Sequence, residues 1–332
     1  MDKERILLAV KDLTVDLMTS KGIVYAVNGV SFAIRSGEIH GIVGESGCGK
    51  SVTVKAVMRL FERKKSRIAG SVKMGGKELL NIPESEMRRL RGAKISIIFQ
   101  EPATFLSPLE KIGDQIGEIL KNHLPDTASA RREKVLSLLE QVKLLPAEKR
   151  IGEYPFELSG GQQQRVMIAQ AVACGPELLI ADEPTTALDV TIQAQILELL
   201  RDLRDKTGMA VLLITHNFGV VAEICDRVSV MYAGKIVETA DVKTLLSSPA
   251  HPYTRHLLDC VPRGRARENK LRTIGGSPPR FRERPAGCPF ASRCFLAGET
   301  CGVFPEPDEI DPGHTVSCRH ARREISRDRG AL

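Results

Sequence analysis

The segment Gly-Glu-Ser-Gly-Cys-Gly-Lys-Ser at residues 44–51 decides the fold. It matches the phosphate-binding loop in full, because its glycines let backbone N–H groups curl around phosphate oxygens where a Cβ would obstruct them. The apolar residues 39–43 before it predict a buried strand, and residues 49–60 predict a helix. This order of strand, loop and helix predicts a nucleoside triphosphate site with the positive end of the helix dipole directed at the phosphates.

All eight loop residues are expected to contact ATP. Lys50 is expected to reach the β- and γ-phosphates, and the hydroxyl of Ser51 to bind Mg²⁺. The complete predicted phosphate-binding set is Gly44, Glu45, Ser46, Gly47, Cys48, Gly49, Lys50 and Ser51.

A second apolar run, residues 178–181, predicts a buried strand that ends at two carboxylates, Asp182 and Glu183. Ligands of open α/β sheets bind at the carboxyl ends of the strands, so both side chains are expected at the site. Asp182 is expected to hold Mg²⁺, and Glu183 to polarise the attacking water as a general base. An apolar strand that ends in two carboxylates is weak evidence for a nucleotide site alone, and strong evidence when it follows a phosphate loop.

A second glycine pair follows Leu158 in the sequence Leu-Ser-Gly-Gly-Gln, residues 158–162. Ser159 is suited to cap the helix that follows, and the amides of Gly160 and Gly161 at the helix start form a second anion site. One nucleotide does not need two such sites from one chain. The second site is therefore expected to face the nucleotide of a partner.

Strands and helices alternate along most of the chain, which predicts an α/β fold with a parallel sheet covered by helices. Residues 6–35 alternate as two strands, and residues 226–240 are expected to form a hairpin around Ala233-Gly234. Residues from about 101 to 160 have helical spacing and few strand signals, which indicates a helical insert. The composition changes near Pro262 to an Arg-, Pro-, Gly- and Cys-rich tail.

Composition excludes several classes of protein. No apolar run approaches the roughly 18 residues that span a bilayer, and the N-terminus lacks the apolar region of a signal peptide, so a cytosolic chain is expected. Tryptophan is absent and aromatic residues are few in the 332-residue chain, which argues against base stacking and a nucleic-acid partner despite the net charge of +7.

Together these motifs resemble the nucleotide-binding subunit of an ABC transporter over residues 1–260. The resemblance implies a P-loop ABC ATPase core, that is, a RecA-like parallel sheet plus an antiparallel β subdomain, with the helical insert at 101–160. In that family two subunits pack head to tail, and each ATP lies between one phosphate loop and the other subunit's Leu-Ser-Gly-Gly-Gln signature, here Ser159, Gly160, Gly161 and Gln162.

The resemblance also assigns roles to further residues. Gln100 matches a glutamine that senses Mg²⁺ and the γ-phosphate, and His216 matches a switch histidine at the γ-phosphate. Asp189 matches a residue that touches the opposite site. The family usually stacks an aromatic residue on adenine where this chain has Leu17, so Tyr25, the nearest aromatic residue, is the candidate for that role.

The tail, residues 261–332, is expected to form a small Cys-rich module. Four cysteines in a segment too short for a core of its own suggest a metal clamp, with zinc and an iron–sulfur cluster both compatible. The sequence around residues 251–263 and this cysteine pattern resemble the dipeptide and oligopeptide branch of ABC importers, some of which hold a 4Fe–4S cluster. The cluster is therefore preferred to Zn²⁺, with the ligands Cys288, Cys294, Cys301 and Cys318.

The resemblance implies an ATPase, using ATP and Mg²⁺, that powers the import of di- and oligopeptides from the cytoplasmic face of the membrane. The implied partners are a second ATPase subunit, more often a paralogue than an identical copy, two transmembrane permease subunits and an extracytoplasmic solute-binding protein. Related subunits serve nickel or metal chelates, glutathione or antimicrobial peptides. The alternative from another class is a soluble ABC ATPase acting on ribosomes or DNA, which usually joins two nucleotide domains in one chain.

Overall fold

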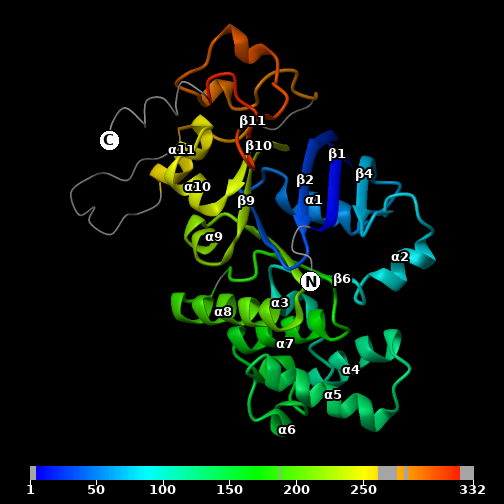
Figure 1. Cartoon of the computed structure of the whole chain (residues 1–332). Helices are drawn as coiled ribbons and strands as arrows, with labels where there is room; N and C mark the ends of the chain where they lie inside the picture. Colours follow the sequence, from blue (N-terminus) through cyan, green and yellow to red (C-terminus); the bar gives the residue numbers. More distant parts are fainter. Residues whose placement is uncertain (1–4, 187, 261–274, 280–282, 322–332) are drawn as a thin grey trace. The chain divides into compact units, whose positions relative to one another are not determined.

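The computed structural model describes residues 5–186, 188–260, 275–279 and 283–321 (Figure 1). The chain divides into two compact units. The first unit contains Met1–Leu7, Arg35–Glu38 and Asn81–Ile214, and the second contains Leu8–Ile34, Ile39–Leu80 and Thr215–Leu332.

The first unit is built on parallel strands, β6 (Ile95–Ile98), β7 (Leu178–Asp182) and β8 (Ala210–Thr215). β7 lies between the other two, and Asp182 at its carboxyl end stands opposite Ile214 of β8. All five residues of β7 are buried, as a parallel strand covered on both faces requires.

Helices make up the rest of this unit, and α4, α5 and α6 lie close together beside α7 in Figure 1. Side chains cap three of them, since Thr127, Ser159 and Asp189 accept hydrogen bonds from the first turns of α5, α7 and α8. The helices are α2 (Glu84–Leu90), α3 (Pro102–Phe105), α4 (Ile112–His123), α5 (Ala128–Gln141), α6 (Ala147–Arg150), α7 (Gly160–Val172) and α8 (Val190–Thr207), with a 3₁₀ turn at Pro155–Glu157.

The second unit contains an antiparallel sheet of order β2-β1-β4-β5 and the strands β3, β9, β10, β12 and β11. β3 and β9 are parallel, whereas β9, β10, β12 and β11 follow one another antiparallel. The strands are β1 (Ile6–Thr19), β2 (Gly22–Arg35), β3 (Ile39–Val43), β4 (Ser66–Met74), β5 (Lys77–Glu78), β9 (Arg227–Tyr232), β10 (Lys235–Asp241), β11 (Asp308–Asp311) and β12 (His314–Val316).

The helices of the second unit are α1 (Lys50–Val57), α9 (Phe218–Ile224), α10 (Val242–Ser247) and α11 (Pro252–Asp259), and 3₁₀ turns lie at Ala291–Arg293 and Glu299–Gly302. The β9–β10 hairpin is confirmed. Ala233 and Gly234 have φ of 46° and 82°, the pair of positive values that a tight two-residue turn needs.

The α/β fold class expected from the sequence is confirmed. The proposed domain boundary at 260/261 falls at the edge of residues 261–274, which lie outside the described residues. The sequence did not predict β4 or β5, nor the two short C-terminal strands. Of these, β12 pairs with β10 and β11 pairs with β12, so residues 308–316 extend the sheet of the second unit. Strands of three and four residues are too short to show a sequence period.

A buried carboxylate joins these C-terminal elements. Glu238 of β10 is fully buried, and it accepts hydrogen bonds from the backbone N–H groups of Ala250 and His251 at 2.7 and 2.9 Å. Its Oε1 also lies 2.8 Å from Nε2 of His314 in β12. Because a buried carboxylate is costly without partners, these contacts fix the start of α11 and β12 to β10.

His251 caps α11 through Nδ1, which accepts a hydrogen bond from the N–H of Tyr253 at 3.0 Å. Burial lowers the pKa of His251 to about 4, against the opposing attraction of Glu238. The folded chain therefore keeps this ring neutral, whereas the unfolded chain protonates it near pH 6.5. The stability that depends on neutral His251 is present above that pH and is lost as the pH falls from about 6.5 toward 4.

We expect the His251→Asn variant to lose this part of the pH dependence, because asparagine can cap the helix but takes up no proton. Between pH 6.5 and 4, the free energy of unfolding of the wild-type chain should fall more steeply than that of the variant. The two slopes should differ by up to about 1.4 kcal/mol per pH unit. Urea denaturation of both proteins across this range measures the difference. Parallel pH profiles would show that His251 does not titrate on unfolding.

Candidate functional site

The phosphate loop lies between β3 and α1, as the sequence predicts. Two of its glycines are required by close approach of other backbone atoms. A Cβ on Gly44 would lie 2.1 Å from the carbonyl oxygen of Met231, and one on Gly49, whose φ is 108°, would lie 2.6 Å from the carbonyl oxygen of Ala26. No other residue fits at either position without moving backbone.

The Lys50 side chain is folded onto its own loop. Its Nζ donates to the carbonyl oxygens of Gly44 and Glu45 at 2.8 and 3.0 Å, and lies 3.8 Å from Sγ of Cys48. Ser51 follows it in the first turn of α1. The Cys48 thiol is buried, which raises its pKa, so it is protonated and serves as a small packed side chain.

Two residues of the C-terminal half hold the second residue of the loop. The backbone N–H of Glu45 donates to Oη of Tyr253 at 3.0 Å. The guanidinium of Arg293 donates to both Glu45 carboxylate oxygens, at 2.7 and 3.0 Å, and to Oη of Tyr232 at 3.1 Å. Neither contact can be predicted from the sequence, since no spacing rule links residue 45 with residues 253 and 293.

The second unit also carries Tyr25 and His216. Tyr25 lies on β2, and the guanidinium carbon of Arg284 is 5.2 Å from its ring centroid. Arg284 is itself held by Asp16 and Asn28. His216 is exposed in the turn between β8 and α9, where Asn217 caps the helix by accepting a hydrogen bond from Gly219 N–H at 2.8 Å.

The first unit brings Gln100 and Glu183 together. Nε2 of Gln100 donates to Oε2 of Glu183 at 3.0 Å, and Oγ1 of Thr186 donates to the same oxygen at 2.8 Å. Glu183 has a φ of 49°, and its N–H donates to the carbonyl oxygen of Ile214 at 2.9 Å. A left-handed glutamate is strained, and such strain concentrates at functional sites.

Asp182, next to Glu183, is nearly buried at the end of β7, with 4% of its surface exposed. The sequence-based expectation that these two carboxylates end one buried strand therefore agrees with the structure. They present oxygen atoms only, which is the donor chemistry that Mg²⁺ prefers.

The signature segment begins α7. Ser159 Oγ accepts a hydrogen bond from Gln162 N–H at 3.4 Å, and Gln162 Oε1 accepts one from Ser159 N–H at 2.9 Å. This reciprocal capping box confirms Ser159 as the helix cap. Ser159 and Gly160 are exposed, and a Cβ on Gly161 would lie 2.7 Å from Cγ2 of Ile192 in α8.

Asp189 is exposed and caps α8, since its Oδ1 accepts a hydrogen bond from Ile192 N–H at 2.9 Å. The two units of the chain divide the candidate residues into two sets. The second unit holds Gly44, Glu45, Ser46, Gly47, Cys48, Gly49, Lys50, Ser51, Tyr25 and His216, and the first unit holds Gln100, Asp182, Glu183, Ser159, Gly160, Gly161, Gln162 and Asp189.

The iron–sulfur expectation is wrong. Within the described residues, which include Cys288, Cys294, Cys301 and Cys318, no group of three or more His, Cys, Asp or Glu side chains could hold a metal ion. Burial raises the pKa of the Cys288 thiol, and it raises that of Cys318 to about 11. Cys294 and Cys318 accept hydrogen bonds from the nearby N–H groups of Leu296 and His320, both at 3.4 Å.

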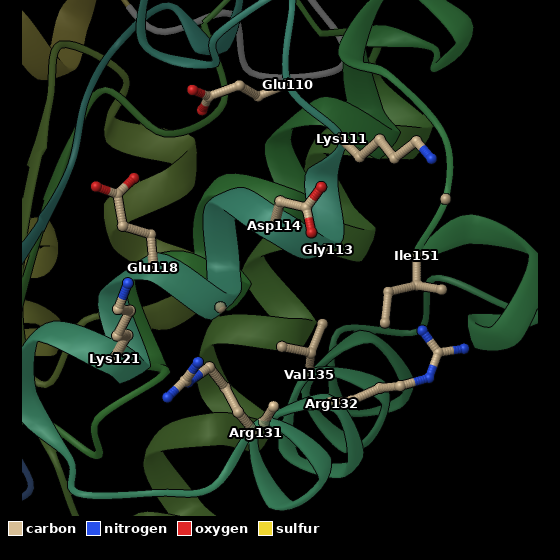
Figure 2. A pocket seen from close by; sticks show the side chains of 13 residues that line it. Glu110, Lys111, Gly113, Asp114, Glu118, Lys121, Arg131, Arg132, Val135 and Ile151 are labelled. Carbon is tan, nitrogen blue, oxygen red and sulfur yellow. The ribbon is translucent and has the colours of Figure 1, made fainter.

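A pocket of about 670 Å³ lies among the helices of the first unit (Figure 2). Asp114 and Glu118 of α4 and Arg131 and Arg132 of α5 are among its lining side chains, so its wall carries both charges. None of the candidate site residues belongs to this lining. The pocket is therefore lined by other residues than those of the candidate site.

Comparison with protein families gives two matches. Residues 27–186 match the family described as ABC transporter. Residues 237–301 match the family described as oligopeptide/dipeptide transporter, C-terminal region. The second match includes α11 and the segment that carries Arg293.

Similar proteins cover nearly the whole chain. The "Probable peptide ABC transporter ATP-binding protein y4tR" of Sinorhizobium fredii is 49% identical over 98% of each chain. The "Oligopeptide transport ATP-binding protein OppD" of Escherichia coli is 47% identical over 94% of this chain and 92% of its own. The "Dipeptide transport ATP-binding protein DppD" of Bacillus subtilis is 47% identical over 94% of this chain and 93% of its own.

The chain is also similar to solved structures of ABC ATP-binding proteins. A dimeric post-hydrolysis state of an ATP-binding cassette bound to ADP and Pi is similar with a TM-score of 0.64, at 28% identity over 71% of this chain and 99% of that one. A subunit of the cbiONQ ABC transporter complex of Clostridium perfringens is similar with a TM-score of 0.62, at 25% identity over 74% and 92%.

We expect the Gly44→Ala variant to lose both stability and ATP binding, because the new Cβ would collide with the carbonyl oxygen of Met231. The free energy of unfolding should fall by about 1–3 kcal/mol, the usual cost of overpacking. Urea denaturation and titration with a fluorescent ATP analogue measure the two effects.

Gly152→Ala is the matched control, since its Cβ would lie 3.9 Å from the nearest atom, the carbonyl oxygen of Lys149. It should change stability by no more than about 0.5 kcal/mol. A Gly44→Ala protein as stable as this control, with wild-type affinity for ATP, would contradict the packing argument.

Proposed function

The chain belongs to the ATP-binding proteins of oligopeptide and dipeptide ABC transporters, and we propose that it hydrolyses ATP to power the import of di- and oligopeptides across the cytoplasmic membrane. The observation that carries the proposal is the pairing of Gln100 with Glu183 at the carboxyl end of β7, in a chain that also holds a complete phosphate loop. The identity of nearly half of its residues with peptide transport ATP-binding proteins supports the cargo class.

The phosphate loop binds the nucleotide in this proposal. Gly44 to Gly49 direct backbone N–H groups at the phosphate oxygens, and Tyr25 stacks on the adenine. Lys50 Nζ exchanges its bonds to the Gly44 and Glu45 carbonyl oxygens for bonds to the β- and γ-phosphates. The lysine thus moves from its own loop to the substrate.

Ser51, Gln100 and Asp182 hold Mg²⁺, which neutralises charge on the phosphates when it is bound. Glu183 orients water in line with the γ-phosphorus and takes its proton as the new P–O bond forms. The bond between that phosphorus and the bridging oxygen of ADP breaks in the same step, so ADP and inorganic phosphate are the products. Gln100 and Thr186 hold one carboxylate oxygen of Glu183, Oε2, in place. His216 contacts the γ-phosphate from the turn after β8.

The signature serves a second ATPase subunit. Ser159, Gly160, Gly161 and Gln162 present a capped, exposed helix start, which suits the γ-phosphate of a partner's ATP. Asp189, which caps α8, touches the opposite site. The similar cassette that was solved as a dimer with ADP and Pi supports this assembly, and we propose a paralogue as the partner.

Two transmembrane permease subunits and an extracytoplasmic solute-binding protein complete the transporter. Within the described part of the chain no helix is long and apolar enough to cross a membrane. We therefore propose that the permeases hold the chain at the cytoplasmic face of the membrane, where closure of the ATPase dimer is transmitted to them. The peptide names of the relatives favour peptides over nickel chelates or glutathione as cargo.

We expect Glu183→Gln to keep the ATP affinity of the wild type and to lower turnover by at least about 100-fold, since the amide cannot accept the proton of water. ATP should then trap a closed dimer. Nucleotide titration, phosphate release and size-exclusion chromatography with ATP measure the three effects.

Glu177→Gln is the matched control, because the Glu177 carboxylate pairs with Lys94 at 2.7 Å on the surface of the same unit. It should hydrolyse ATP at the wild-type rate. Lys50→Ala should instead lose affinity for ATP. Near-normal turnover of Glu183→Gln would exclude this residue as the general base.

A further inference from the structure

We propose that Tyr253 of α11 and Arg293 of the following 3₁₀ turn form a brace that positions Glu45 of the phosphate loop and sets the affinity for ATP. Both residues lie in the C-terminal segment, by which we mean the described residues from 250 to 321. Arg293 acts in this scheme as a positioning residue, because it reaches the loop and not the nucleotide. The proposal rests on the proposed function, since it concerns the same ATP site. Neither residue belongs to a nucleotide-binding motif of the sequence.

Glu45 is fixed at two points. Its backbone N–H donates to Oη of Tyr253 at 3.0 Å, and both of its carboxylate oxygens accept hydrogen bonds from Arg293, at 2.7 and 3.0 Å. Paired, charge-assisted bonds of this kind set geometry as well as energy. The backbone direction of residue 45 is therefore determined from outside the loop.

The pair is also shielded from solvent. Only 6% of the Arg293 side chain is exposed, against 22% of Glu45. Arg293 Nε donates to the carbonyl oxygen of Gly275 at 2.8 Å. This bond holds the guanidinium through a nitrogen that does not contact Glu45. An ion pair with this geometry and burial is much stronger than a surface pair.

Three aromatic rings support the brace. Phe290 is fully buried, and its ring centroid lies 5.2 Å from those of both Tyr232 and Tyr253. The Tyr232 and Tyr253 centroids are 4.5 Å apart, in an edge-to-face arrangement. Arg293 follows Phe290 by one 3₁₀ turn, so the buried ring fixes where the guanidinium stands.

The support of Tyr253 reaches back to β10. Glu238 binds the N–H groups of Ala250 and His251, and His251 caps the helix that carries Tyr253. Both arms of the brace are thus built on the described part of the C-terminal segment. Their residues lie within the part of the chain that matches the oligopeptide/dipeptide C-terminal family.

The brace has an electrostatic consequence for ATP. Glu45 places a negative charge in a loop that must bind the phosphates of ATP. Arg293 compensates that charge through its two hydrogen bonds. Removing the guanidinium leaves the carboxylate to repel the phosphates and frees the loop to move, and both effects weaken ATP binding.

Titration of the full-length chain with a fluorescent ATP analogue and Mg²⁺ tests the proposal. We expect Arg293→Ala to raise the Kd about tenfold, which corresponds to 1.4 kcal/mol. Arg293→Lys should lie between this variant and the wild type, because lysine keeps the charge but loses the paired geometry. Arg319→Ala removes an exposed arginine of the same segment and should bind as the wild type does.

The double variant Glu45→Gln, Arg293→Ala separates positioning of the loop from general damage to the fold. It should bind ATP more tightly than Arg293→Ala alone, because the uncompensated carboxylate is gone, whereas a merely structural role predicts no recovery. Should Arg293→Ala not fold, as judged by circular dichroism, Arg293→Lys is compared with Glu45→Gln, Arg293→Lys, and this second double variant should likewise bind ATP more tightly.

In the assembled transporter, the KM for ATP should rise in Arg293→Ala while kcat stays near the wild-type value, because Glu183 is untouched. A Kd for Arg293→Ala equal to that of Arg319→Ala, or no recovery in the double variant, would overturn the brace and leave the proposed function standing. A wild-type chain that binds no ATP would instead overturn the proposed function, and the brace with it.

Discussion

The contact between the phosphate loop and the β9–β10 hairpin is the constraint on which the nucleotide-binding half of the chain depends. Gly44 approaches the Met231 carbonyl so closely that a Cβ would lie 2.1 Å from it, and Gly234 N–H donates to the Cys48 carbonyl oxygen at 2.8 Å. The loop therefore takes its shape from residues almost two hundred positions further along the chain. Buried Glu238 continues this support from β10 to α11, which carries Tyr253 to Glu45.

In the first unit, the arrangement of Glu183 is determined by contacts close to it in the fold. Glu183 is held in a strained left-handed conformation by the strand that precedes it and by its bond to the Ile214 carbonyl oxygen. Gln100 and Thr186 then fix one carboxylate oxygen, which orients the residue that we propose as the general base before any substrate arrives. Preorganisation of this kind lowers the reorganisation that the reaction requires.

The sequence predicted those features that local rules determine. The glycines of residues 44–51, the carboxylates that end β7 and the capping serine of α7 each follow from the needs of a loop, a strand end or a helix start. The brace could not be predicted, because it joins residues 45, 253 and 293 through tertiary contacts that have no period or spacing. The cysteine pattern misled for the same reason: four thiols near one another in sequence did not form a metal-binding group among the described residues.

We propose that ATP hydrolysis by this chain drives peptide import. The most direct measurement is ATP-dependent uptake of a labelled oligopeptide by proteoliposomes that contain the chain, its partner ATPase and both permeases, with the solute-binding protein added outside. We expect uptake to need enclosed ATP and Mg²⁺, and we expect the rate of ATP hydrolysis to rise when the binding protein carries peptide. Hydrolysis indifferent to loaded binding protein, together with no uptake, would contradict it.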